Sequence, residues 1–596
     1  MEAGPAGPGR RGGCKQVKIG KMIRTYAGNY GKYLILCPVS MIGEVAMETT
    51  IPLMTANLIN NAIPKSQETG DISQVLLYGG LMVLMALSSM AFGMLGSYLS
   101  SKGAFGFSRN LRQALFEKVQ HFSFKNIDHF STASLVTRLT TDVNQVQGTV
   151  MMVVRMAVRS PIMLVMALVM ALQLQSSLVV ILAIAIPILA AAIAIIMKLA
   201  FPRFQIMMKK YDALNSSVQE NLIAIRVVKA FVRATHEKEK FAASADDVTA
   251  TQRAAEKIVL WNGPIMNILM NGCIVAVLYL GGMRIVQGNM AFGDLTAFIT
   301  YITQILMALM MLSFLFLGFV LSRASIARIS EVLEEAPDIA SPENALTEVK
   351  DGSIVFDHVN FSYQGDPNHL VLTDINLKIK SGETIGVIGG TGSAKTTLVS
   401  LIPRLYDITS GSLLVGGQDV RKYDIHALRD QVAMVLQKNV LFSGTIKENL
   451  RWGDENATDE EITAACQAAA ADEFVRSFPD GYETDLGQGG VNVSGGQKQR
   501  LCIARALLKK PKIMILDDAT SAVDTATDAR IREALRTQMA DTTKIIIAQR
   551  ITSVMEADHI LVLDEGKVMD FGTHDELMRR SEIYREVYTS QQKGVA

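Results

Sequence analysis

The stretch Gly389-Gly390-Thr391-Gly392-Ser393-Ala394-Lys395-Thr396 decides how the second half of this chain folds. Its glycines, lysine and threonine have the order of a phosphate-binding loop that runs into a helix. In such a loop backbone amides turn toward a phosphate, the lysine supplies charge, and the threonine hydroxyl binds magnesium. We therefore predict that residues 389–396 and Thr397 bind a nucleotide, with Thr396 a Mg²⁺ ligand. Because glycine-rich turns before helices also occur for structural reasons alone, other segments must support this prediction.

Other segments supply the remaining parts of a nucleotide site. Ile513-Met514-Ile515-Leu516-Asp517-Asp518 predicts a buried strand that carries a magnesium-ligating Asp517. Tyr363 is placed to stack on an adenine, and Gln437 follows the short run Val435-Leu436. The segment Val493-Ser494-Gly495-Gly496-Gln497 and the turn Ser521-Ala522-Val523-Asp524 come later in the chain. The order of these segments along the chain makes a purely structural origin of the glycine-rich loop much less probable than the loop alone would.

The composition predicts a membrane protein with a soluble part. The chain has 596 residues, of which 49% are hydrophobic and only 19% charged, so it is too long for one domain and too apolar to be wholly soluble. A net charge of +1 gives no indication of a nucleic-acid partner. The five cysteines are scattered without metal-ligand spacing, which fits a reducing cytoplasm and predicts no disulfides.

Six apolar runs in the first half approach the ~20 residues that span a bilayer. The long connections after the second and fourth runs are rich in Lys and Arg, so the positive-inside rule places them, the N-terminus and the second half in the cytoplasm. The predicted location is the plasma membrane. The six spans are expected near residues 33–58, 75–101, 150–173, 177–198, 258–281 and 295–321.

The two long connections have helical periodicity and few breakers, so we expect the helices to continue beyond the bilayer. Residues 126–130 and 219–224 would lie at their tips and could touch a cytoplasmic motor. A merely solvated helical hairpin is the alternative.

The second half has the pattern of an α/β domain. Short β-branched runs at 354–356, 384–388, 513–516 and 545–547 alternate with helical stretches, as in a buried, mostly parallel sheet. The predicted fold class is an all-α six-helix transmembrane domain fused to an α/β phosphate-loop domain. The expected boundaries are a disordered tail at 1–20, the membrane domain at 21–325, a linker at 326–350 and the nucleotide-binding domain at 351–590.

These motifs together make the chain resemble the ATP-binding cassette (ABC) exporters over nearly its whole length. The resemblance implies ATP and Mg²⁺ as cofactors, with Gln437 near the metal and the reacting water. It also implies that Ser494, Gly495, Gly496 and Gln497, the signature of the family, close over the nucleotide held by a second cassette. One chain would then be half of a transporter.

Four positions depart from the pattern of this family. Asp518 stands where the family has a catalytic Glu, and Gln549 stands where it has a His against the γ-phosphate. The shorter carboxylate is misplaced by about 1 Å, which can lower a rate on the order of 10²-fold, and Gln549 cannot pass a proton. Gln488 replaces a Glu that contacts the coupling loops. Ala394 replaces a loop glycine, which is tolerated at negative φ and strained at positive φ.

This combination resembles one subunit of the bacterial heterodimeric ABC multidrug exporters. It predicts an ATPase-coupled translocase whose own site, built on Asp518 and Gln549, binds ATP but hydrolyses it poorly, so that activity needs a partner chain. Expected substrates are amphipathic drugs or lipid-like molecules. The alternatives are a homodimeric exporter of lipid or peptide and a regulatory membrane protein gated by nucleotide.

Two acidic residues lie in the first predicted span. Glu44 and Glu48 are four residues apart and share a helix face, and intramembrane acids usually face a cavity or a partner. The spacing is equally compatible with two roles: Glu44 and Glu48 could bind a cationic substrate, or they could form structural hydrogen bonds. Arg155 and Arg159 in the third span are interpreted as anchors at the membrane interface.

Overall fold

The computed structural model describes residues 19–519 and 521–593, which form two compact units. The first unit contains the described residues up to Gln120 together with Ala133–Glu335. The second contains His121–Thr132 together with the described residues from Ala336 onward. His121–Thr132 therefore packs with the second unit, although it lies between helices of the first in the sequence. The expected tail at residues 1–20 falls outside the described residues except for its last two.

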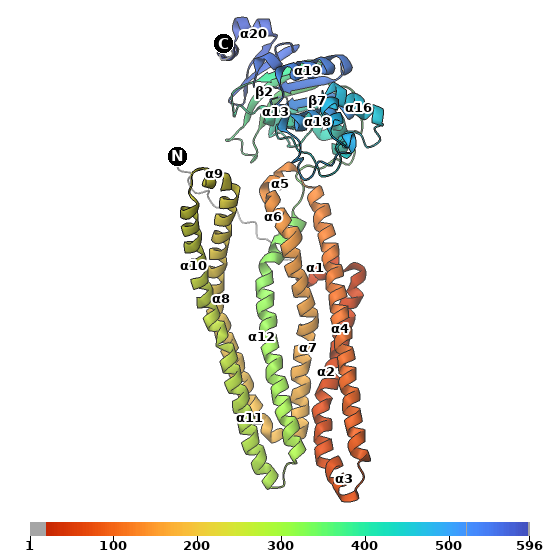
Figure 1. The fold of residues 1–596 in the computed structure, drawn as a ribbon, viewed down its shortest axis with the longest axis vertical. Coiled ribbons are helices and arrows are strands. Elements are labelled where there is room, and N and C mark those ends of the chain that lie inside the picture. Colours follow the sequence, from red (N-terminus) through yellow and green to blue (C-terminus); the bar gives the residue numbers. More distant parts are fainter. Residues whose placement is uncertain (1–18, 520, 594–596) are drawn as a thin grey trace. The chain divides into compact units, whose positions relative to one another are not determined.

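The first unit is built from long helices (Figure 1). Six helical stretches of its described part are long and apolar enough to cross a membrane, and they coincide with the six predicted spans. The 48-residue α4 is ~72 Å long at ~1.5 Å per residue, more than twice the ~30 Å hydrocarbon core. Its Leu84 and Leu87 are 60% and 53% exposed, as expected of a helix whose outer face meets lipid. The elements of this unit, with 3-10 and π turns marked η, are α1 (Ile19–Tyr26), η1 (Gly28–Tyr30), α2 (Gly31–Asn57), η2 (Leu58–Ala62), α3 (Ile63–Thr69), α4 (Ser73–Gln120), α6 (Thr132–Thr137), η3 (Arg138–Asp142), α7 (Val143–Leu174), η4 (Ser176–Leu178), α8 (Val179–Ile223), α9 (Ile225–Ala230), α10 (Ala234–Leu260), α11 (Asn262–Val286) and α12 (Phe292–Glu334).

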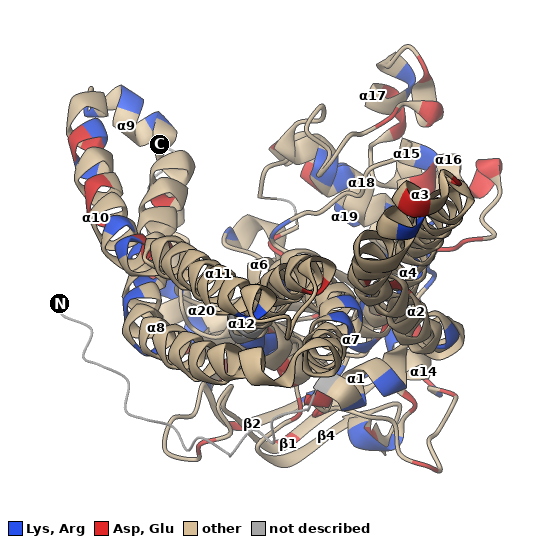
Figure 2. Cartoon of the chain, turned by 90° about the horizontal axis from the view of Figure 1, so that it is seen from below, with Lys and Arg blue, Asp and Glu red and all other residues tan. Residues whose placement is uncertain are grey.

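Charged residues are unevenly distributed over the helices of the first unit. Figure 2 shows Lys, Arg, Asp and Glu along α9 and α10, whereas α11 is almost wholly tan and has one charged residue, Arg284. The second expected tip, residues 219–224, covers the last turn of α8 and the residue that follows it. The chain reverses direction slightly later, at α9. α12 continues to Glu334, so helical structure extends nine residues into the range expected as linker.

The second unit contains a six-stranded sheet in the order β10-β9-β3-β8-β7-β6. All neighbouring strands in it are parallel except β10, which runs antiparallel to β9. A second, four-stranded sheet has the order β2-β1-β4-β5 and is antiparallel. The run 354–356 lies in β1 of this sheet, so its assignment to the mostly parallel sheet was wrong, and β2, β4 and β5 were not predicted from the sequence. The predicted fold class is confirmed. The strands are β1 (Ile354–Phe361), β2 (Leu372–Ile379), β3 (Thr384–Ile388), β4 (Ser410–Val415), β5 (Gln418–Asp419), β6 (Val432–Val435), β7 (Ile513–Asp517), β8 (Thr543–Ile547), β9 (His559–Asp564) and β10 (Lys567–Gly572).

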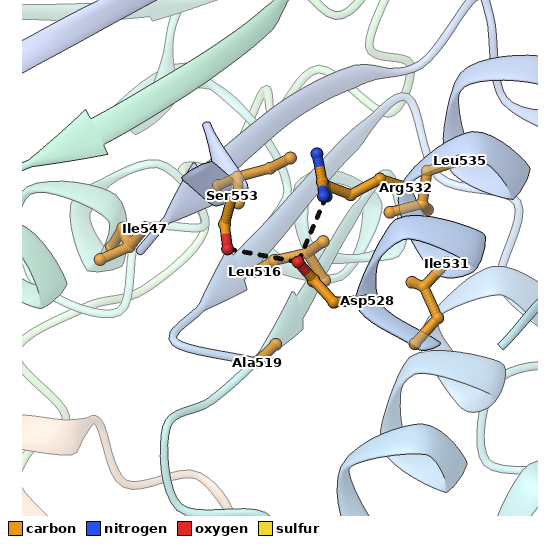
Figure 3. Close-up of a pocket in the computed structure, with 9 residues that line it drawn as sticks. Leu516, Ala519, Asp528, Ile531, Arg532, Leu535, Ile547 and Ser553 are labelled. Carbon is orange, nitrogen blue, oxygen red and sulfur yellow. Dashed lines mark hydrogen bonds and ion pairs between the residues drawn. The ribbon is translucent and has the colours of Figure 1, made fainter. Parts of the chain in front are cut away.

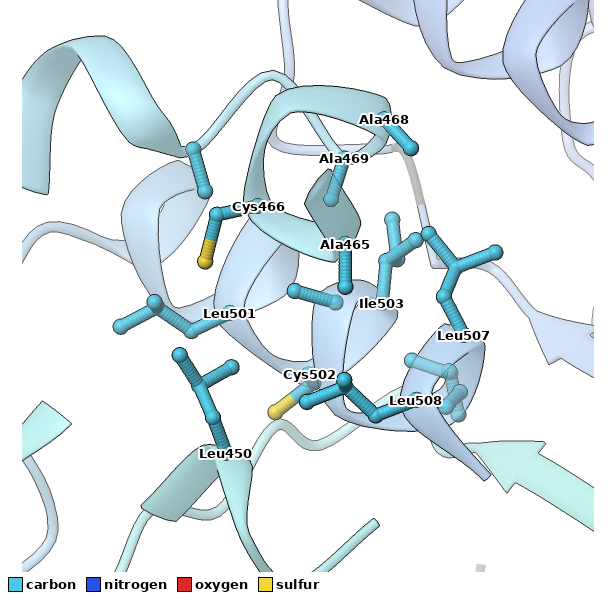
Figure 4. Close-up of a cluster of buried hydrophobic side chains, with 14 of the residues drawn as sticks. Leu450, Ala465, Cys466, Ala468, Ala469, Leu501, Cys502, Ile503, Leu507 and Leu508 are labelled. Atoms are coloured by element: carbon cyan, nitrogen blue, oxygen red, sulfur yellow. The ribbon is translucent and has the colours of Figure 1, made fainter. Parts of the chain in front are cut away.

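The helices of the second unit cover these sheets and form a separate apolar cluster. Figure 4 shows Leu501, Ile503 and Leu507 of α18 packed against Ala465 and Cys466 of α16, and all five are buried. Small side chains on α16 let the two helices approach closely, and this contact fixes the position of α18. The helical elements are α5 (Phe124–Phe130), α13 (Lys395–Leu401), η5 (Val420–Lys422), α14 (Ile425–Asp430), α15 (Ile446–Leu450), α16 (Asp459–Ala468), α17 (Asp472–Ser477), η6 (Gly481–Glu483), α18 (Gly495–Leu508), α19 (Thr525–Gln538), η7 (Ile551–Ser553), α20 (His574–Arg580) and α21 (Glu582–Lys593).

Candidate functional site

The sheet topology gathers the predicted nucleotide residues at one edge. Parallel strands end on the same side of a sheet, and ligands of such sheets bind beyond those carboxyl ends. β3 is followed by the phosphate loop, β7 ends in Asp517, and β8 is followed two residues later by Gln549. β6 likewise ends two residues before Gln437. Residues more than a hundred positions apart therefore meet at one edge.

Lys395 folds back on the phosphate loop. Its Nζ donates to the carbonyl oxygens of Gly389 and Gly390 at 2.9 and 2.8 Å. Burial lowers the pKa of Lys395, and the carboxylates of Asp517 and Asp518 oppose that shift. A phosphate is a stronger acceptor for an ammonium than a carbonyl, so an entering nucleotide can take over these hydrogen bonds.

Ala394 adopts the positive-φ conformation, which is the strained one of the two that the sequence left open. Its φ is 69° and its ψ 25°, in the left-handed region, immediately before α13. Gly392 in the same loop also has a positive φ of 87°, but glycine pays no steric cost there. The Ala394 methyl group therefore adds on the order of 1–2 kcal/mol of strain to the loop.

The two side chains predicted as Mg²⁺ ligands, Thr396 and Asp517, contact each other. The Thr396 hydroxyl donates to Oδ2 of Asp517 at 2.8 Å, so the two predicted ligands are adjacent. Burial raises the pKa of Asp517, whereas the hydrogen bond from Thr396 opposes the rise. Both residues offer the hard oxygen ligands that Mg²⁺ prefers, usually completed by substrate phosphates and water. The described residues contain no group of three or more His, Cys, Asp or Glu side chains that could hold a metal ion.

Asp518 is held by two side-chain amides. Its Oδ2 accepts a hydrogen bond from Nε2 of Gln549 at 2.9 Å and lies 3.5 Å from Nε2 of Gln437, at the limit of a hydrogen bond. Asp518 is buried and has a positive φ of 51°. Two of the four positions that depart from the family pattern are thus in direct contact, which the sequence, where they are 31 positions apart, did not indicate.

The signature segment, residues 493–497, begins α18. The Ser494 side chain accepts from the backbone amide of Gln497, and the Gln497 side chain accepts from the Ser494 amide. Such a capping box fixes the start of the helix. One turn later Gln499, which is buried, donates to the Asp518 carbonyl at 3.3 Å and accepts from the Ala522 amide at 3.1 Å. Sequence reasoning gave Gln499 no role, although a polar residue on the buried face of α18 was the available signal.

Tyr363 lies beside the phosphate loop and a second tyrosine. Its hydroxyl is 2.9 Å from the Thr397 hydroxyl, and its ring packs edge-on against Tyr406, with the centroids 5.1 Å apart. The Tyr406 hydroxyl donates to Asp128 of α5 at 2.8 Å, and its ring contacts Phe124 at 6.0 Å. Tyr363 is 42% exposed, which leaves a ring face for an adenine. Tyr406, which the sequence analysis did not select, connects this tyrosine to the first predicted tip.

A small pocket lies behind the strand that ends in Asp517. Figure 3 shows Asp528 of α19 at its centre, between Arg532 and Ser553. The Ser553 hydroxyl donates to Oδ2 of Asp528 at 3.3 Å, and Nε of Arg532 lies 3.3 Å from the same oxygen. The hydrogen bond between Ser553 and Asp528 connects α19, which follows the turn 521–524, to η7, which follows Gln549.

The intramembrane acids share one arginine. Nε of Arg159 in α7 lies 3.2 Å from Oε1 of Glu44, and its Nη2 lies 2.7 Å from Oε2 of Glu48. The sequence analysis missed this pairing of Arg159, which follows from the high cost of an unpaired carboxylate in an apolar bundle. Oε2 of Glu44 is buried and has no hydrogen-bond partner in the described structure.

Comparison with known proteins agrees with this arrangement. Residues 34–309 match the ABC transporter transmembrane region, and residues 372–521 match the ABC transporter ATP-binding domain. The fold resembles the structure of a bacterial Atm1-family ABC exporter with ATP bound, with a TM-score of 0.83 and 24% identity over 94% of this chain and 99% of that one.

Several relatives match over most of their length. The ABC transporter ATP-binding protein YfiB of Bacillus subtilis is 39% identical over 92% of this chain and 95% of its own length. A fatty acid ABC transporter ATP-binding/permease protein of Mycobacterium tuberculosis is 34% identical over 80% of this chain and 75% of its own. The chain belongs to the ABC transporter family and carries the transmembrane region and the ATP-binding domain of that family in one polypeptide.

Proposed function

We propose that this chain is one half of an ATP-driven exporter and that its own nucleotide site binds ATP but hydrolyses it poorly. The observation that carries the proposal is the contact between Asp518 and Gln549. A carboxylate that activates water must offer a free oxygen lone pair at the right distance. Asp518 is one methylene shorter than glutamate, and its Oδ2 already accepts from an amide that cannot take up a proton.

The signature segment supports a second, competent site formed with another chain. The capping box at Ser494 and Gln497 is complete, and Gln499 ties it to the turn after β7. ABC exporters work as dimers of half-transporters, so this signature would serve the nucleotide held by the partner. We propose a different chain as that partner, with Glu and His at the positions matching Asp518 and Gln549.

The tip around α9 supports an interaction with a second chain. Ile223, Phe231 and Val232 are 78%, 73% and 85% exposed, although they lie far from the apolar runs that span the membrane. Exposed apolar side chains at a polar helix tip indicate a binding surface. The other tip, α5, packs within the second unit of its own chain. We propose that α9 relays closure of the partner's cassette.

The substrate is proposed to be an amphipathic drug or a lipid-like molecule, moved from the cytoplasm or inner leaflet to the outside of the plasma membrane. The 34% identical fatty acid transporter makes an amphiphile the natural candidate. We propose that Glu44 and Glu48 contact its polar head, because Oε2 of Glu44 is buried and unpartnered. Arg159 neutralises one of the two carboxylates, so a substrate bearing an amine would neutralise the other.

ATPase assays test the degenerate site. The full chain should be nearly silent alone and active when co-purified with a second cassette chain, whose catalytic Glu→Gln change should abolish turnover. Asp518→Glu with Gln549→His in this chain should raise its own hydrolysis on the order of 10²-fold. Asp541→Glu with Gln538→His, the same changes at exposed positions, is the matched control. Brisk hydrolysis by the unaltered chain alone would favour a homodimeric exporter. ATP binding and an active pair without substrate movement in vesicles would favour a nucleotide-gated regulator.

A further inference from the structure

Two lysine ammonium groups lie against one tyrosine ring at the start of α2. Nζ of Lys32 is 5.3 Å from the ring centroid of Tyr33, and Nζ of Lys102 in α4 is 4.8 Å from the same centroid. Lys102 also donates to the Tyr98 hydroxyl at 2.9 Å. Both lysines are exposed, and neither forms an ion pair with any described residue. Two cations therefore share one ring without a countercharge.

The surrounding sequence provides no acid to balance them. No Asp or Glu occurs between residues 3 and 43 or between residues 72 and 116. The described parts of these two segments carry six basic residues, Lys21, Arg24, Lys32, Lys102, Arg109 and Arg112. Like charges repel, so this end of α2 and α4 favours an anionic ligand.

The same face of α4 changes from apolar to basic along its length. Leu95, Tyr98, Lys102, Phe105 and Arg109 follow helical spacing, and all five side chains are exposed. Lys102 lies ~44 Å along α4 from its start, beyond the ~30 Å hydrocarbon core that begins at the opposite end. An exposed order of leucine, tyrosine and lysine is typical of a helix that crosses the boundary between acyl chains and headgroups.

Helix α1 adds charge to this boundary and is fixed to α4. Nδ2 of Asn110 donates to the Tyr26 carbonyl at 3.0 Å, and the Tyr30 ring lies directly over Gly106, where a Cβ would come within 2.0 Å of it. Lys21 and Arg24 on α1 are exposed. Figure 2 shows α1 as a short helix that carries Lys and Arg. The basic residues of α1 are thus held in place against α4, within the first unit.

We propose that Lys32 and Lys102 bind the phosphate headgroup of an anionic phospholipid, with Tyr33 and Tyr98 at the level of its ester groups. The exposed apolar side chains that continue from this point, Leu95 on α4 and Leu36 on α2, would contact the acyl chains. A free phosphate would gain nothing from that apolar continuation, so the lipid is the occupant that matches the whole surface. The site is independent of the ATP site and of the direction of transport.

Native mass spectrometry of the full chain, purified in detergent and titrated with phosphatidylglycerol or phosphatidylcholine, tests this site. Phosphatidylglycerol should bind more tightly. Lys32→Gln with Lys102→Gln should weaken its binding about 30-fold, or about fivefold for each ammonium removed, and Lys32→Arg with Lys102→Arg should retain it. Lys65→Gln, an exposed lysine at the opposite end of the bundle, is the matched control.

Three results would overturn the proposal. Equal affinity for the two lipids would show that headgroup charge is not recognised. A loss of about fivefold in the Lys65→Gln variant, the same as for each ammonium removed from the site, would show that net charge alone attracts the lipid. Displacement of bound phosphatidylglycerol by millimolar inorganic phosphate would show a site for free anions.

Discussion

Replacing Arg159 by glutamine removes the cation that lies between Glu44 and Glu48. The side chains of Glu44, Arg159 and Glu48 are 13%, 21% and 34% exposed, so the group is largely but not fully desolvated. Breaking a fully buried ion pair by removing one partner costs about 3–5 kcal/mol. Because these side chains retain some exposure, we expect Arg159→Gln to lower the free energy of unfolding by about 2–3 kcal/mol.

Thermal unfolding of the full chain in detergent measures this effect, and the expected fall in melting temperature is about 4–8 °C. The decisive comparison is the triple variant Glu44→Gln, Glu48→Gln, Arg159→Gln. It keeps the shape of the cluster without any charge, so most of the lost stability should return. Arg253→Gln, at an exposed position of α10, controls for the loss of a positive charge.

The reasoning predicts that the single variant is less stable than the triple variant. If Arg159→Gln unfolds at the same temperature as Arg253→Gln, the arginine does not compensate buried carboxylates. If the triple variant is less stable than Arg159→Gln, the uncompensated charge of the two carboxylates does not explain the loss of stability in the single variant.

Three further predictions concern the nucleotide-binding domain. Ala394→Gly should relieve the strain of the positive φ in the folded state. It should also give the unfolded chain more conformational entropy, which costs about 0.4–1 kcal/mol of stability. The free energy of unfolding in chemical denaturation should therefore rise by at most about 1 kcal/mol, and a clear fall would mean that the methyl group packs favourably. Because burial raises the pKa of Asp517, a proton competes with Mg²⁺ at a higher pH than at an ordinary carboxylate. Mg²⁺-dependent binding of ATP, measured by calorimetry, should therefore weaken as the pH falls, and Asp517→Asn should lower the affinity and remove this dependence; an unchanged pH profile in that variant would contradict the assignment. Ser494→Ala should cost about 1 kcal/mol through loss of the cap of α18 and lower ATPase activity only of the assembled pair, whereas reduced ATP binding by the chain alone would place the signature in its own site.

Local sequence patterns were sufficient to predict much of the structure of this protein. The phosphate loop at 389–396, the strand that ends in Asp517 and the six spans each depend on residues close together in the chain, where hydrophobic period, glycine placement and length decide the structure. For the same reason the fold class was predicted correctly. The run at 354–356 was recognised as a strand, but its antiparallel partners β2 and β4 were missed, because their residues alternate between buried and exposed and their pairing joins segments that are distant in the sequence.

The tertiary structure decided which of these residues meet. Two conformations of Ala394 were equally compatible with the sequence, and the turn between β3 and α13 selects the left-handed one. Arg159 pairs with Glu44 and Glu48 over more than a hundred residues, and Gln549 reaches Asp518 from the next strand of the sheet. Such contacts depend on helix packing and strand order, which bring distant side chains within hydrogen-bonding range. Local sequence determines the type of each element, whereas burial of unpaired charges and polar groups determines which partners they take.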